Sequence, residues 1–413
     1  MNKKKVVVFG LGKVFETFIK LFDYSKAEII ALSDNNREVL IKKGGTKAID
    51  PEKIVNLQFD YLVITCKFYD AISEQFKGYG IKEEYIVNFY NVYRHLIIEN
   101  GEVFSEILRD RIPLARKYEN EFESIRLIEE NTMFLSAKIF INLIKDKKLI
   151  SLEEAEFKGY SQFGEDGIIQ WLIHNVQIEQ KIFIEFGAGD YFESNTRFLL
   201  MNNNWSGFVM DSSSENMECL KHWRDYWKYD LKTKSAFITK NNINKLITDA
   251  GYTGDIGILS IDLDGVDYWV LNAIDCVSPR ILICEYNNIF GEEKMVSIPY
   301  DENFDRTKSH YSWLYWGASL AAFSHWASNN NYYYMGSNSA GHNAFFVRKD
   351  CISVDKIPQN ANKFVECKYS ESRGKNGELT YKRGREALEC IKQMRVFDLE
   401  MNCEDTIENI YEI

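Results

Sequence analysis

Two aspartates, a glutamate and an asparagine follow two apolar runs in the middle of the chain, and together they could carry acid–base or metal chemistry. Asp262 and Asp264 come after "DIGILSI", and Glu285 and Asn287 come after "RILIC". Such runs are typical of buried parallel strands, whose carboxyl ends meet at one edge of a sheet. Carboxylate and amide oxygens suit Mg²⁺, and a carboxylate can remove the proton of a hydroxyl group. We therefore expect Asp262, Asp264 and Glu285 to be catalytic, and Asp262, Glu285 and Asn287 to be able to hold a divalent metal.

A structural explanation of these acids stays open at this point, because aspartate is favoured at turns and helix starts. Asp262 and Asp267 would then only cap a turn or the following helix. Histidines are competing bases. We expect His342, in the polar loop "SAGHN", to be catalytic, and His325, at helical spacing in "AAFSHWAS", to be structural. His310, in an aromatic segment, could contact the substrate.

The stretch "KIFIEFGAGDYFESNT" predicts a buried strand that ends in a glycine turn and could hold a cofactor. Glu185 lies at the strand tip, Gly187 and Gly189 form the turn, and Asp190 follows it. Glycines let the backbone approach a ligand closely, and a carboxylate at a strand end can bind an ammonium or hydroxyl group. About twenty residues further on, "GFVMD" ends on Asp211, at the position of an acid that binds ribose hydroxyls.

These motifs resemble, in order and spacing, the class I S-adenosylmethionine (SAM)-dependent methyltransferases. More narrowly, residues 158–350 are similar to the FkbM type in "YSQFGEDGI", "IEFGAGD", "ESNT", "LSIDLDGVDYWVL", "CEYN", "GASL" and "NAFFVRKD". The resemblance implies that SAM is bound by Gln162, Glu185, Gly187, Gly189, Asp190 and Asp211. Glu185, Gly187 and Gly189 would line the methionine end of SAM, and Asp211 would hold its ribose. Gln162 and the "GED" at 164–166 would close over the amino-acid part. The serines after Asp211 depart from the bulkier or charged residue of many relatives, which leaves the adenine and ribose contacts open there.

The same resemblance implies the reaction and the substrate class. FkbM-type enzymes methylate hydroxyl groups of sugars and related metabolites, so we expect a SAM-dependent O-methyltransferase, with Mg²⁺ as the metal that could assist. Its acceptor would be a sugar, sugar-phosphate or nucleotide-sugar in surface-glycan (capsule or lipopolysaccharide) biosynthesis. Residues 300–316 are rich in Tyr and Trp, whose faces stack on sugar rings. This segment either forms an acceptor-binding lid or packs over the sheet.

A second strand and glycine turn stand at the start of the chain, in "KKVVVFGLGKVFETFIKLF". Gly10 and Gly12 form the turn, and "AEIIALSDN" brings Asp34 to the tip of the next strand, as in dinucleotide-binding folds. Phe15 replaces the third glycine of that motif. The turn therefore either binds a nucleotide through Gly10, Gly12 and Asp34 or only reverses the chain.

The first 95 residues resemble the small Rossmann-like domain found beside sugar-modifying enzymes of bacterial surface-polysaccharide pathways. That resemblance implies nucleotide-sugar binding or docking to a partner. The alternatives are an NAD(P)-dependent oxidoreductase domain, which would make the protein bifunctional, and a non-enzymatic adaptor. Hydride chemistry is disfavoured, because no Tyr-x-x-x-Lys pair follows in this segment.

The expected fold class is α/β, with two Rossmann-like doubly wound sheets joined by a helical connector. Residues 1–95 form the first domain, and 96–158, with apolar residues at helical spacing, form the connector. Residues 159–350 form a class I methyltransferase domain whose sheet ends in an antiparallel hairpin, and 351–413 are a C-terminal appendage of a loop and a helix. The connector is expected to be a scaffold, and it is also the expected place of a homo-oligomer contact.

Composition narrows the partners and the compartment. The chain has 413 residues, of which 45% are hydrophobic and 27% charged, and a net charge of −11. These values are typical of a globular protein, and the negative charge disfavours binding to nucleic-acid phosphates. The eight cysteines include no CxxC pair, which fits free thiols in a reducing compartment. With no apolar stretch of membrane-spanning length, we expect a cytoplasmic protein that does not bind nucleic acid and does not span a membrane.

Overall fold

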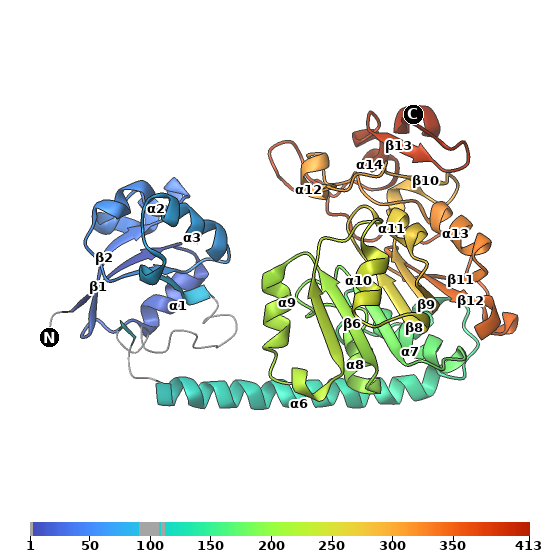
Figure 1. Cartoon of the computed structure of the whole chain (residues 1–413), viewed down its shortest axis with the longest axis horizontal. Helices are drawn as coiled ribbons and strands as arrows, with labels where there is room; N and C mark the ends of the chain where they lie inside the picture. The colour runs from blue at the N-terminus through green and yellow to red at the C-terminus, as the bar shows by residue number, and fades with distance from the viewer. Residues whose placement is uncertain (1–2, 91–106, 109–111) are drawn as a thin grey trace. The chain divides into compact units, whose positions relative to one another are not determined.

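The chain forms two compact units, Met1–Ile128 (unit 1) and Glu129–Ile413 (unit 2). The computed structural model describes residues 3–90, 107–108 and 112–413, including side chains for all of these except 112–124. Helix α6 (Ile112–Ile144) crosses the boundary between the units (Figure 1). Much of the predicted helical connector is therefore one long helix, and its second half belongs to unit 2.

Unit 1 contains a parallel sheet of four strands in the order β2-β1-β3-β4. Its strands are β1 (Lys4–Phe9), β2 (Ala27–Ser33), β3 (Tyr61–Ile64) and β4 (Ile86–Asn88), and its helices include α1 (Lys13–Leu21), α2 (Arg37–Gly44) and α3 (Tyr69–Gly78). Successive β1 residues bury their side chains in different apolar clusters, Val6 and Val8 in one and Val7 in the other. Such strands are typical of a sheet covered on both faces. The predicted Rossmann-like sheet is confirmed.

Unit 2 is built on a seven-stranded sheet in the order β11-β12-β9-β8-β5-β6-β7. The strands are β5 (Ile182–Phe186), β6 (Ser206–Asp211), β7 (Leu231–Ser235), β8 (Gly254–Ile261), β9 (Val277–Glu285), β11 (Tyr332–Ser337) and β12 (Asn343–Arg348). Neighbours are parallel except β12, which is antiparallel to both β9 and β11. The strand order reverses at β5, and open parallel sheets bind ligands beyond the carboxyl ends of strands at such a point. The predicted doubly wound sheet with a final antiparallel hairpin is confirmed.

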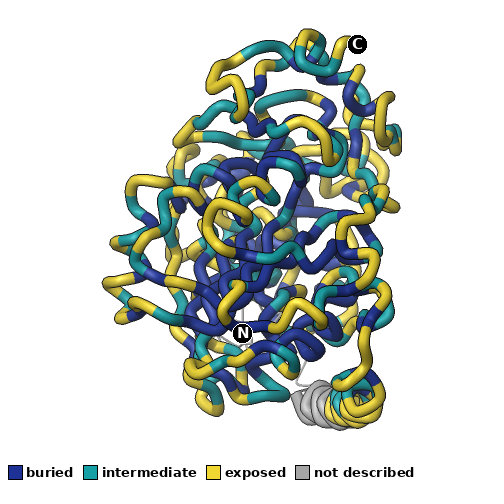
Figure 2. Tube along the Cα trace, turned by 90° about the vertical axis from the view of Figure 1, so that its right-hand side faces the viewer, coloured by how far each residue is buried: buried dark blue, intermediate teal, exposed yellow. Residues whose placement is uncertain are grey.

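Helices cover both faces of this sheet (Figure 1), and the buried segments of the trace gather between them (Figure 2). Phe183 of β5 lies in one apolar cluster, with residues of α7, α8 and α9. Its neighbour Ile184 points to the other face and packs with residues of α10, α11 and α13. These helices are α7 (Glu165–Asn175), α8 (Arg197–Asn203), α9 (Ser214–Lys221), α10 (Ile243–Asp249), α11 (Asp267–Ala273) and α13 (Leu320–Asn329).

The second half of α6 packs along unit 2 through aromatic side chains. The ring centroid of Phe134 lies 5.3 Å from that of Phe198 on α8, and that of Phe140 lies 5.9 Å from that of Phe157. Ala137 on the same side of the helix is buried. Over this length the connector is part of the wall of unit 2.

The C-terminal segment forms a small antiparallel sheet, and the prediction of only a loop and a helix there is wrong. Strand β13 (Arg395–Asp398) pairs with β14 (Cys403–Thr406) and with β10 (Val296–Ser297). The helix expected over "GREALECIKQMRVFDLEM" is limited to α14 (Gly384–Cys390). The remainder becomes a strand because β10 offers it a partner, and Val396 is buried there. Short helices α12 (Arg306–Ser309) and α15 (Ile407–Tyr411) complete this end of unit 2.

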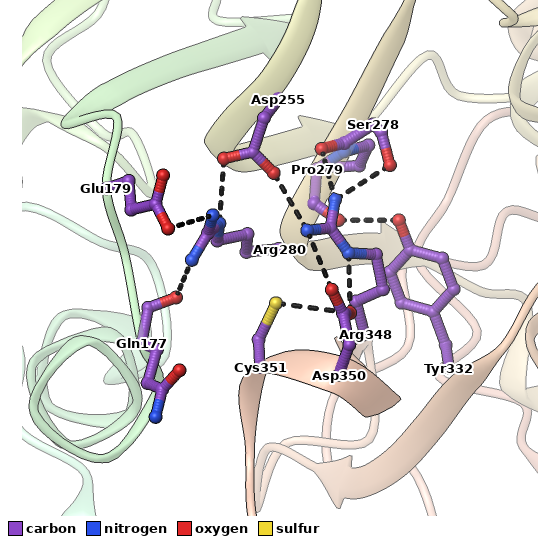
Figure 3. A network of polar contacts seen from close by, with 10 residues as sticks. All are labelled: Gln177, Glu179, Asp255, Ser278, Pro279, Arg280, Tyr332, Arg348, Asp350 and Cys351. Carbon is purple, nitrogen blue, oxygen red and sulfur yellow. Dashed lines mark hydrogen bonds and ion pairs between the residues drawn. The ribbon is translucent and has the colours of Figure 1, made fainter.

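A network of charged side chains ties the opposite end of the sheet, at the amino ends of β8 and β9 (Figure 3). Asp255 of β8 accepts a hydrogen bond of 2.7 Å from Arg280 of β9 and forms an ion pair of 2.8 Å with Arg348 of β12. Arg348 also donates to Asp350 and to the carbonyl of Ser278. One carboxylate thereby links three neighbouring strands.

The cysteines and the helices agree with two expectations from composition. All eight cysteines are free thiols. Among the described residues, no helix combines the length and the apolar character that a membrane crossing needs.

Candidate functional site

The glycine turn after β5 packs directly against the end of β8. Gly187 has a φ of +70°, and a Cβ placed on it would lie 1.5 Å from the carbonyl oxygen of Asp262. Its backbone amide donates to the carbonyl of Met210 on β6 at 2.9 Å. Only glycine fits here, because the left-handed backbone and the close approach both exclude a side chain. The turn and the acid-bearing end of β8 are therefore held together by backbone contact.

Asp211, at the tip of β6, fixes the other side of the turn. Its Oδ2 accepts a hydrogen bond of 3.0 Å from the amide of Gly189, and its Oδ1 accepts one of 2.7 Å from the amide of Ser213. A carboxylate offers about four lone-pair sites, so it can still accept hydrogen bonds from ligand hydroxyls. Asp211 is thus both a part of the turn and an acceptor that faces the space above it.

A cavity of about 310 Å³ lies over this turn, at the carboxyl ends of β5, β6 and β8. The predicted residues in its wall are Gly187, Gly189, Asp211, Asp262 and Asp264, and the others are Ser212, Ala236, Phe237, Ile238, Leu263, Val266, Glu302 and Phe304. The sequence analysis missed Phe237 and Ile238. In the sequence these two residues form an apolar pair just after strand β7. Strand β7 is mostly polar, so it is hard to recognise, and the pair was not linked to the end of a strand. The volume and the mixture of apolar wall and few acids suit a small cofactor.

Three of the predicted cofactor residues, Gln162, Glu185 and Asp190, are absent from the described wall of this cavity. The carboxylate of Glu185 accepts hydrogen bonds from Ser194 Oγ (2.7 Å), from the amides of Asn195 (2.9 Å) and Thr196 (3.2 Å), and from the Thr196 hydroxyl. Glu185 therefore fixes the "ESNT" loop. Asp190 accepts from the amide of Phe192, and Gln162 is exposed.

The "GED" segment that follows Gln162 fixes its own loop in a similar way. Asp166 is buried, and its Oδ2 accepts from the amides of Gly159, Tyr160 and Ser161 at 2.6–2.9 Å. Burial raises the pKa of Asp166 to about 6, although these hydrogen bonds stabilise the charged form and act to lower the pKa. The adjacent Glu165 accepts from the side-chain amides of Asn338 and Asn343 at the β11–β12 hairpin. These acids hold the loop against the sheet, which is a positioning role.

The acids at the ends of β8 and β9 come together as predicted. One carboxylate oxygen from each of Asp262, Asp264 and Glu285 lies within 4.8 Å of the others. Oε2 of Glu285 is buried, and it receives no hydrogen bond from an N–H or hydroxyl donor of the described residues. The cluster therefore contains a buried carboxylate oxygen that no described donor satisfies.

Burial and mutual repulsion perturb this cluster strongly. Burial, followed by the charges of Asp264 and Asp267, raises the pKa of Asp262 to about 8. Burial and the charge of Asp262 raise the pKa of Glu285 well above its usual range. Carboxyl groups with such pKa values can take up a proton near neutral pH, and they also attract a cation that would replace that proton.

Asp267 and Asn287 have structural roles beside the cluster. Asp267 at the start of α11 accepts from the amides of Leu263 (2.6 Å) and Gly265 (3.0 Å), so the turn-capping explanation applies to it. Asn287 is buried, and its amide nitrogen donates to the carbonyls of Leu314 and Trp316. Its oxygen accepts from the amide of Ile289. The metal prediction omitted Asp264. Asp264, rather than Asn287, is the third side chain that could bind a metal together with Asp262 and Glu285.

Arg306 on α12 forms an ion pair with Asp264 of the cluster, and the sequence analysis missed it. Its Nη1 donates to Asp264 Oδ1 at 2.6 Å, and its Nε donates to the carbonyl of Trp313 at 3.0 Å. Its guanidinium lies 4.7 Å over the ring of Trp316. Nothing in the local sequence marks this arginine, because the chain reverses over some forty residues to bring it back to Asp264.

A second cavity, of about 670 Å³, is lined by Arg306 but by none of the three acids of the cluster. Its wall includes His342, Arg306, Trp316, Cys367, Tyr369 and Arg383. The ring of His342 stacks on Phe163, at 4.9 Å between centroids and 9° between planes, and Phe163 stacks on Tyr369 at 5.1 Å and 17°. Nε2 of His342 lies 3.3 Å from Sγ of Cys367, and burial lowers the pKa of His342. The predicted catalytic His342 thus lines this second cavity, as a neutral imidazole at neutral pH.

The aromatic segment 300–316 partly packs and partly lines this cavity, so packing accounts for some of its residues and the lid stays a prediction. Leu314 and Tyr315 are buried in a cluster with the C-terminal strands, and Leu314 and Trp316 form part of the cavity wall. His310 bonds to the Ser312 hydroxyl at 2.7 Å, and burial lowers its pKa. His325 lies exposed on α13 beside Asn329, at 2.9 Å from its amide.

The glycine turn of unit 1 is fixed by an aspartate that accepts two backbone amides, as Asp211 does in unit 2. We call this arrangement an aspartate clamp. Asp34 Oδ2 accepts from the amide of Leu11 at 2.8 Å, and its Oδ1 accepts from the amide of Asn36 at 2.8 Å. Gly10 has a φ of +91°, and a Cβ there would lie 3.0 Å from that of Cys66, whereas the corresponding space at Gly12 is open. These contacts account for Gly10 and Asp34 without a ligand, and they leave the nucleotide prediction for this turn untested.

A protein-family model matches the N-terminal part of the chain. A family model described as C2185-like, N-terminal, matches residues 2–87. No curated protein matches the chain.

The solved structures that match the chain include methyltransferases. An O-methyltransferase from Bacillus cereus in complex with SAH is 11% identical, with 40% of this chain and 72% of that chain covered and a TM-score of 0.27. A SAM-dependent methyltransferase from Clostridium acetobutylicum is 9% identical, with 45% and 90% covered and a TM-score of 0.29. Identities and TM-scores this low carry no conclusion about activity, so the functional case rests on the site itself.

Proposed function

We propose that the chain is a SAM-dependent O-methyltransferase, with SAM bound in the 310 Å³ cavity of unit 2. The observation that carries this proposal is the shared wall of that cavity, in which Gly187, Gly189 and Asp211 lie together with the acids Asp262 and Asp264. A glycine turn allows the donor to approach the backbone, and Asp211 accepts its ribose hydroxyls. Phe237 offers an exposed ring on which adenine stacks.

In this proposal the acid cluster activates the acceptor hydroxyl. The oxygen of the acceptor attacks the sulfonium methyl group in line, so an O–CH₃ bond forms while the S–CH₃ bond breaks and leaves SAH. The hydroxyl proton passes to the Asp262–Glu285 pair, whose raised pKa values suit a proton acceptor near neutral pH. Much of the rate comes from holding donor and acceptor in one orientation.

A divalent metal fits the same carboxylates. Three acids within 4.8 Å, and the buried Oε2 of Glu285 that no donor among the described residues reaches, make an oxygen-rich set that suits Mg²⁺. Asp262, Asp264 and Glu285 would hold the ion, and Asn287 would hold the wall behind them. When bound, the ion would lower the pKa of the acceptor hydroxyl.

For the acceptor we propose a sugar, a sugar-phosphate or a nucleotide-sugar of surface-glycan biosynthesis, as in the FkbM-type enzymes that unit 2 resembles. The 670 Å³ cavity supports this class. Trp316 and Tyr369 offer aromatic faces for a sugar ring, while His342 and Arg383 offer hydrogen-bonding groups. Free cysteines throughout agree with a cytoplasmic enzyme.

Calorimetry with SAM and SAH, followed by transfer of a labelled methyl group to a panel of sugars, sugar-phosphates and nucleotide-sugars, tests the proposal. We expect micromolar binding of both ligands and labelling of at least one acceptor. Asp262→Asn should abolish transfer and retain SAH binding, whereas Asp275→Asn, an exposed acid, should leave both unchanged. If neither SAM nor SAH binds at high micromolar concentration, the proposal fails.

For unit 1 we propose a docking role, and a nucleotide-sugar or NAD(P) site is the alternative. The observation that favours docking is that Phe15 replaces the third glycine of the dinucleotide-binding motif in this turn. Titration of the full-length protein with NADH, NADPH and UDP-sugars should give no binding that Asp34→Ala removes. Binding that depends on Asp34 would establish the alternative.

A further inference from the structure

The outward side of α6 carries an apolar stripe that the described residues of unit 2 leave uncovered. Leu135, Ile139 and Leu143 expose 63%, 58% and 72% of their surface. Toward the N-terminal end of the helix the same line continues with Ile128 and Ile125. We call these five residues the α6 stripe. Single exposed apolar residues are normal, but a continuous line of them usually marks an interaction surface.

Most of the stripe has the spacing of a coiled-coil seam. Four of its residues, at positions 125, 128, 135 and 139, form with Thr132 and Asn142 a series in steps of three and four residues, and Leu143 lies next to this series. A seam with this period faces a partner helix along its whole length, here roughly 27 Å. A small ligand or an irregular loop does not require such a period.

The opposite side of α6 already has its partner, which sets this helix apart from an ordinary surface helix. Phe134, Ala137, Phe140 and Ile144 face unit 2, where Ala137 and Ile144 are buried. An amphipathic surface helix normally has one apolar side and one polar side. Helix α6 has two apolar sides, and the second one requires another explanation.

The polar members of the seam favour an identical partner. Thr132 and Asn142 interrupt the apolar line, and a polar residue in a seam is tolerated best when it meets another polar residue. In a parallel, in-register pair of the same helix, Asn142 meets Asn142 and Thr132 meets Thr132. A two-fold contact of one surface with itself is also the commonest form of assembly. We propose that α6 is a dimerisation helix and that the α6 stripe is covered by the α6 stripe of a second copy of this chain.

The size of the seam sets the strength of this dimer. Five half-exposed aliphatic side chains can remove roughly 400 Å² of apolar surface per copy from water. A standard stable interface buries about 800 Å² per partner. The stripe supplies about half of that, so the dimer should dissociate on dilution into the low micromolar range.

Sedimentation velocity of the full-length protein tests the proposal. We expect a dimer at about 100 µM that dissociates on dilution toward about 1 µM. The double variant Leu135→Glu/Ile139→Glu should be monomeric at every concentration, with an unchanged circular dichroism spectrum. Met401→Glu is the matched control, because Met401 is an equally exposed apolar residue (71%) outside α6, and it should remain dimeric.

Several results would overturn the proposal. The wild-type protein could be monomeric at about 100 µM, which would mean that no second copy covers the stripe. A dimer that Leu135→Glu/Ile139→Glu leaves intact would place the contact elsewhere. The wild-type protein could instead be monomeric and co-sediment with phosphatidylcholine–phosphatidylglycerol vesicles. If the double variant does not co-sediment, the stripe binds a lipid surface and not a second copy.

Discussion

Arg306 donates a hydrogen bond of 2.6 Å from Nη1 to Oδ1 of Asp264, and this ion pair places a guanidinium at the mouth of an acidic cluster. The ring of Trp316 and the carbonyl of Trp313 hold the same guanidinium from two further directions. Its charge also opposes the upward pKa shift of Glu285. Arg306 is therefore the built-in counter-ion of Asp262, Asp264 and Glu285.

Removal of this counter-ion should strengthen metal binding to the cluster. Arg306→Gln takes away a unit charge that competes with a divalent ion for Asp264, so we expect Mn²⁺ affinity to rise about tenfold in calorimetry without SAM. Arg373→Gln is the control, because Arg373 lies over Trp313 at 4.5 Å and pairs with Glu371. Equal Mn²⁺ affinity in wild type and Arg306→Gln would contradict the counter-ion role, and no Mn²⁺ binding in either would remove the metal from the proposed function.

Gly187 should tolerate no side chain. Gly187→Ala would bring a Cβ to 1.5 Å from the Asp262 carbonyl, which forces the turn away from β8 and should lower SAM affinity by at least about a hundredfold. Gly254→Ala separates this clash from backbone strain, because Gly254 has a similar φ of +72° but open space at its Cβ. That control should lose about 1 kcal/mol of stability and retain SAM binding. Calorimetry measures the SAM affinity of each variant, and thermal unfolding measures its stability. An equal loss of SAM binding in the two variants would show that the contact between Gly187 and the Asp262 carbonyl is not what binding depends on.

The two aspartate clamps should differ in function although their geometry is the same. Asp211→Ala removes the acceptor for the Gly189 amide and for ribose, and the loss of charged hydrogen bonds should weaken SAM binding about 10- to 100-fold. Asp34→Ala removes the equivalent clamp in unit 1 and should leave SAM binding unchanged. Calorimetry on both variants decides this. Similar losses in both would mean that unit 1 takes part in binding the donor.

The buried Asp166 should make the stability of the protein depend on pH. Its pKa is about 6 in the folded protein and about 3.9 in an unfolded chain, so the folded state retains a proton that the unfolded state has released. Its contribution to stability is therefore present below about pH 4 and is lost as the pH rises through about 6. Between pH 4.5 and 7.5 the wild type should lose about 2 kcal/mol relative to Asp166→Asn.

Urea unfolding of both proteins at these two pH values, followed by tryptophan fluorescence, measures that difference. Asp275→Asn, which removes an exposed acid, should keep the pH dependence of the wild type. Parallel pH dependences of the wild type and Asp166→Asn would show that Asp166 does not carry the effect.

The sheet of unit 2 and the floor of its cavity could be predicted from the sequence because local patterns encode them. Apolar runs marked β5, β8 and β9, and the glycines between β5 and α8 marked a turn that approaches another backbone closely. The position of Asp211 followed from its distance along the chain. Each of these features depends on residues within one strand and the turn after it.

The sequence could not predict the features that long-range contacts create. Arg306 reaches Asp264 from a separate segment, and the stack of His342, Phe163 and Tyr369 joins three loops. The charge and position of Glu185 suggested a ligand contact, but its carboxylate is consumed by the loop that follows it. A carboxylate at a strand tip looks the same in sequence whether its partner is a cofactor or a backbone amide.

The Asp255 network has a consequence for protein engineering. It fastens β8, β9 and β12 at the end of the sheet away from both cavities, through Arg280 and Arg348 (Figure 3). The loops that form the proposed acceptor cavity leave from the opposite ends of β9 and β12. Those loops can therefore be exchanged or randomised to change the preference for an acceptor, because the Asp255 network keeps the strands in register. Asp255, Arg280 and Arg348 should stay unchanged in such a library.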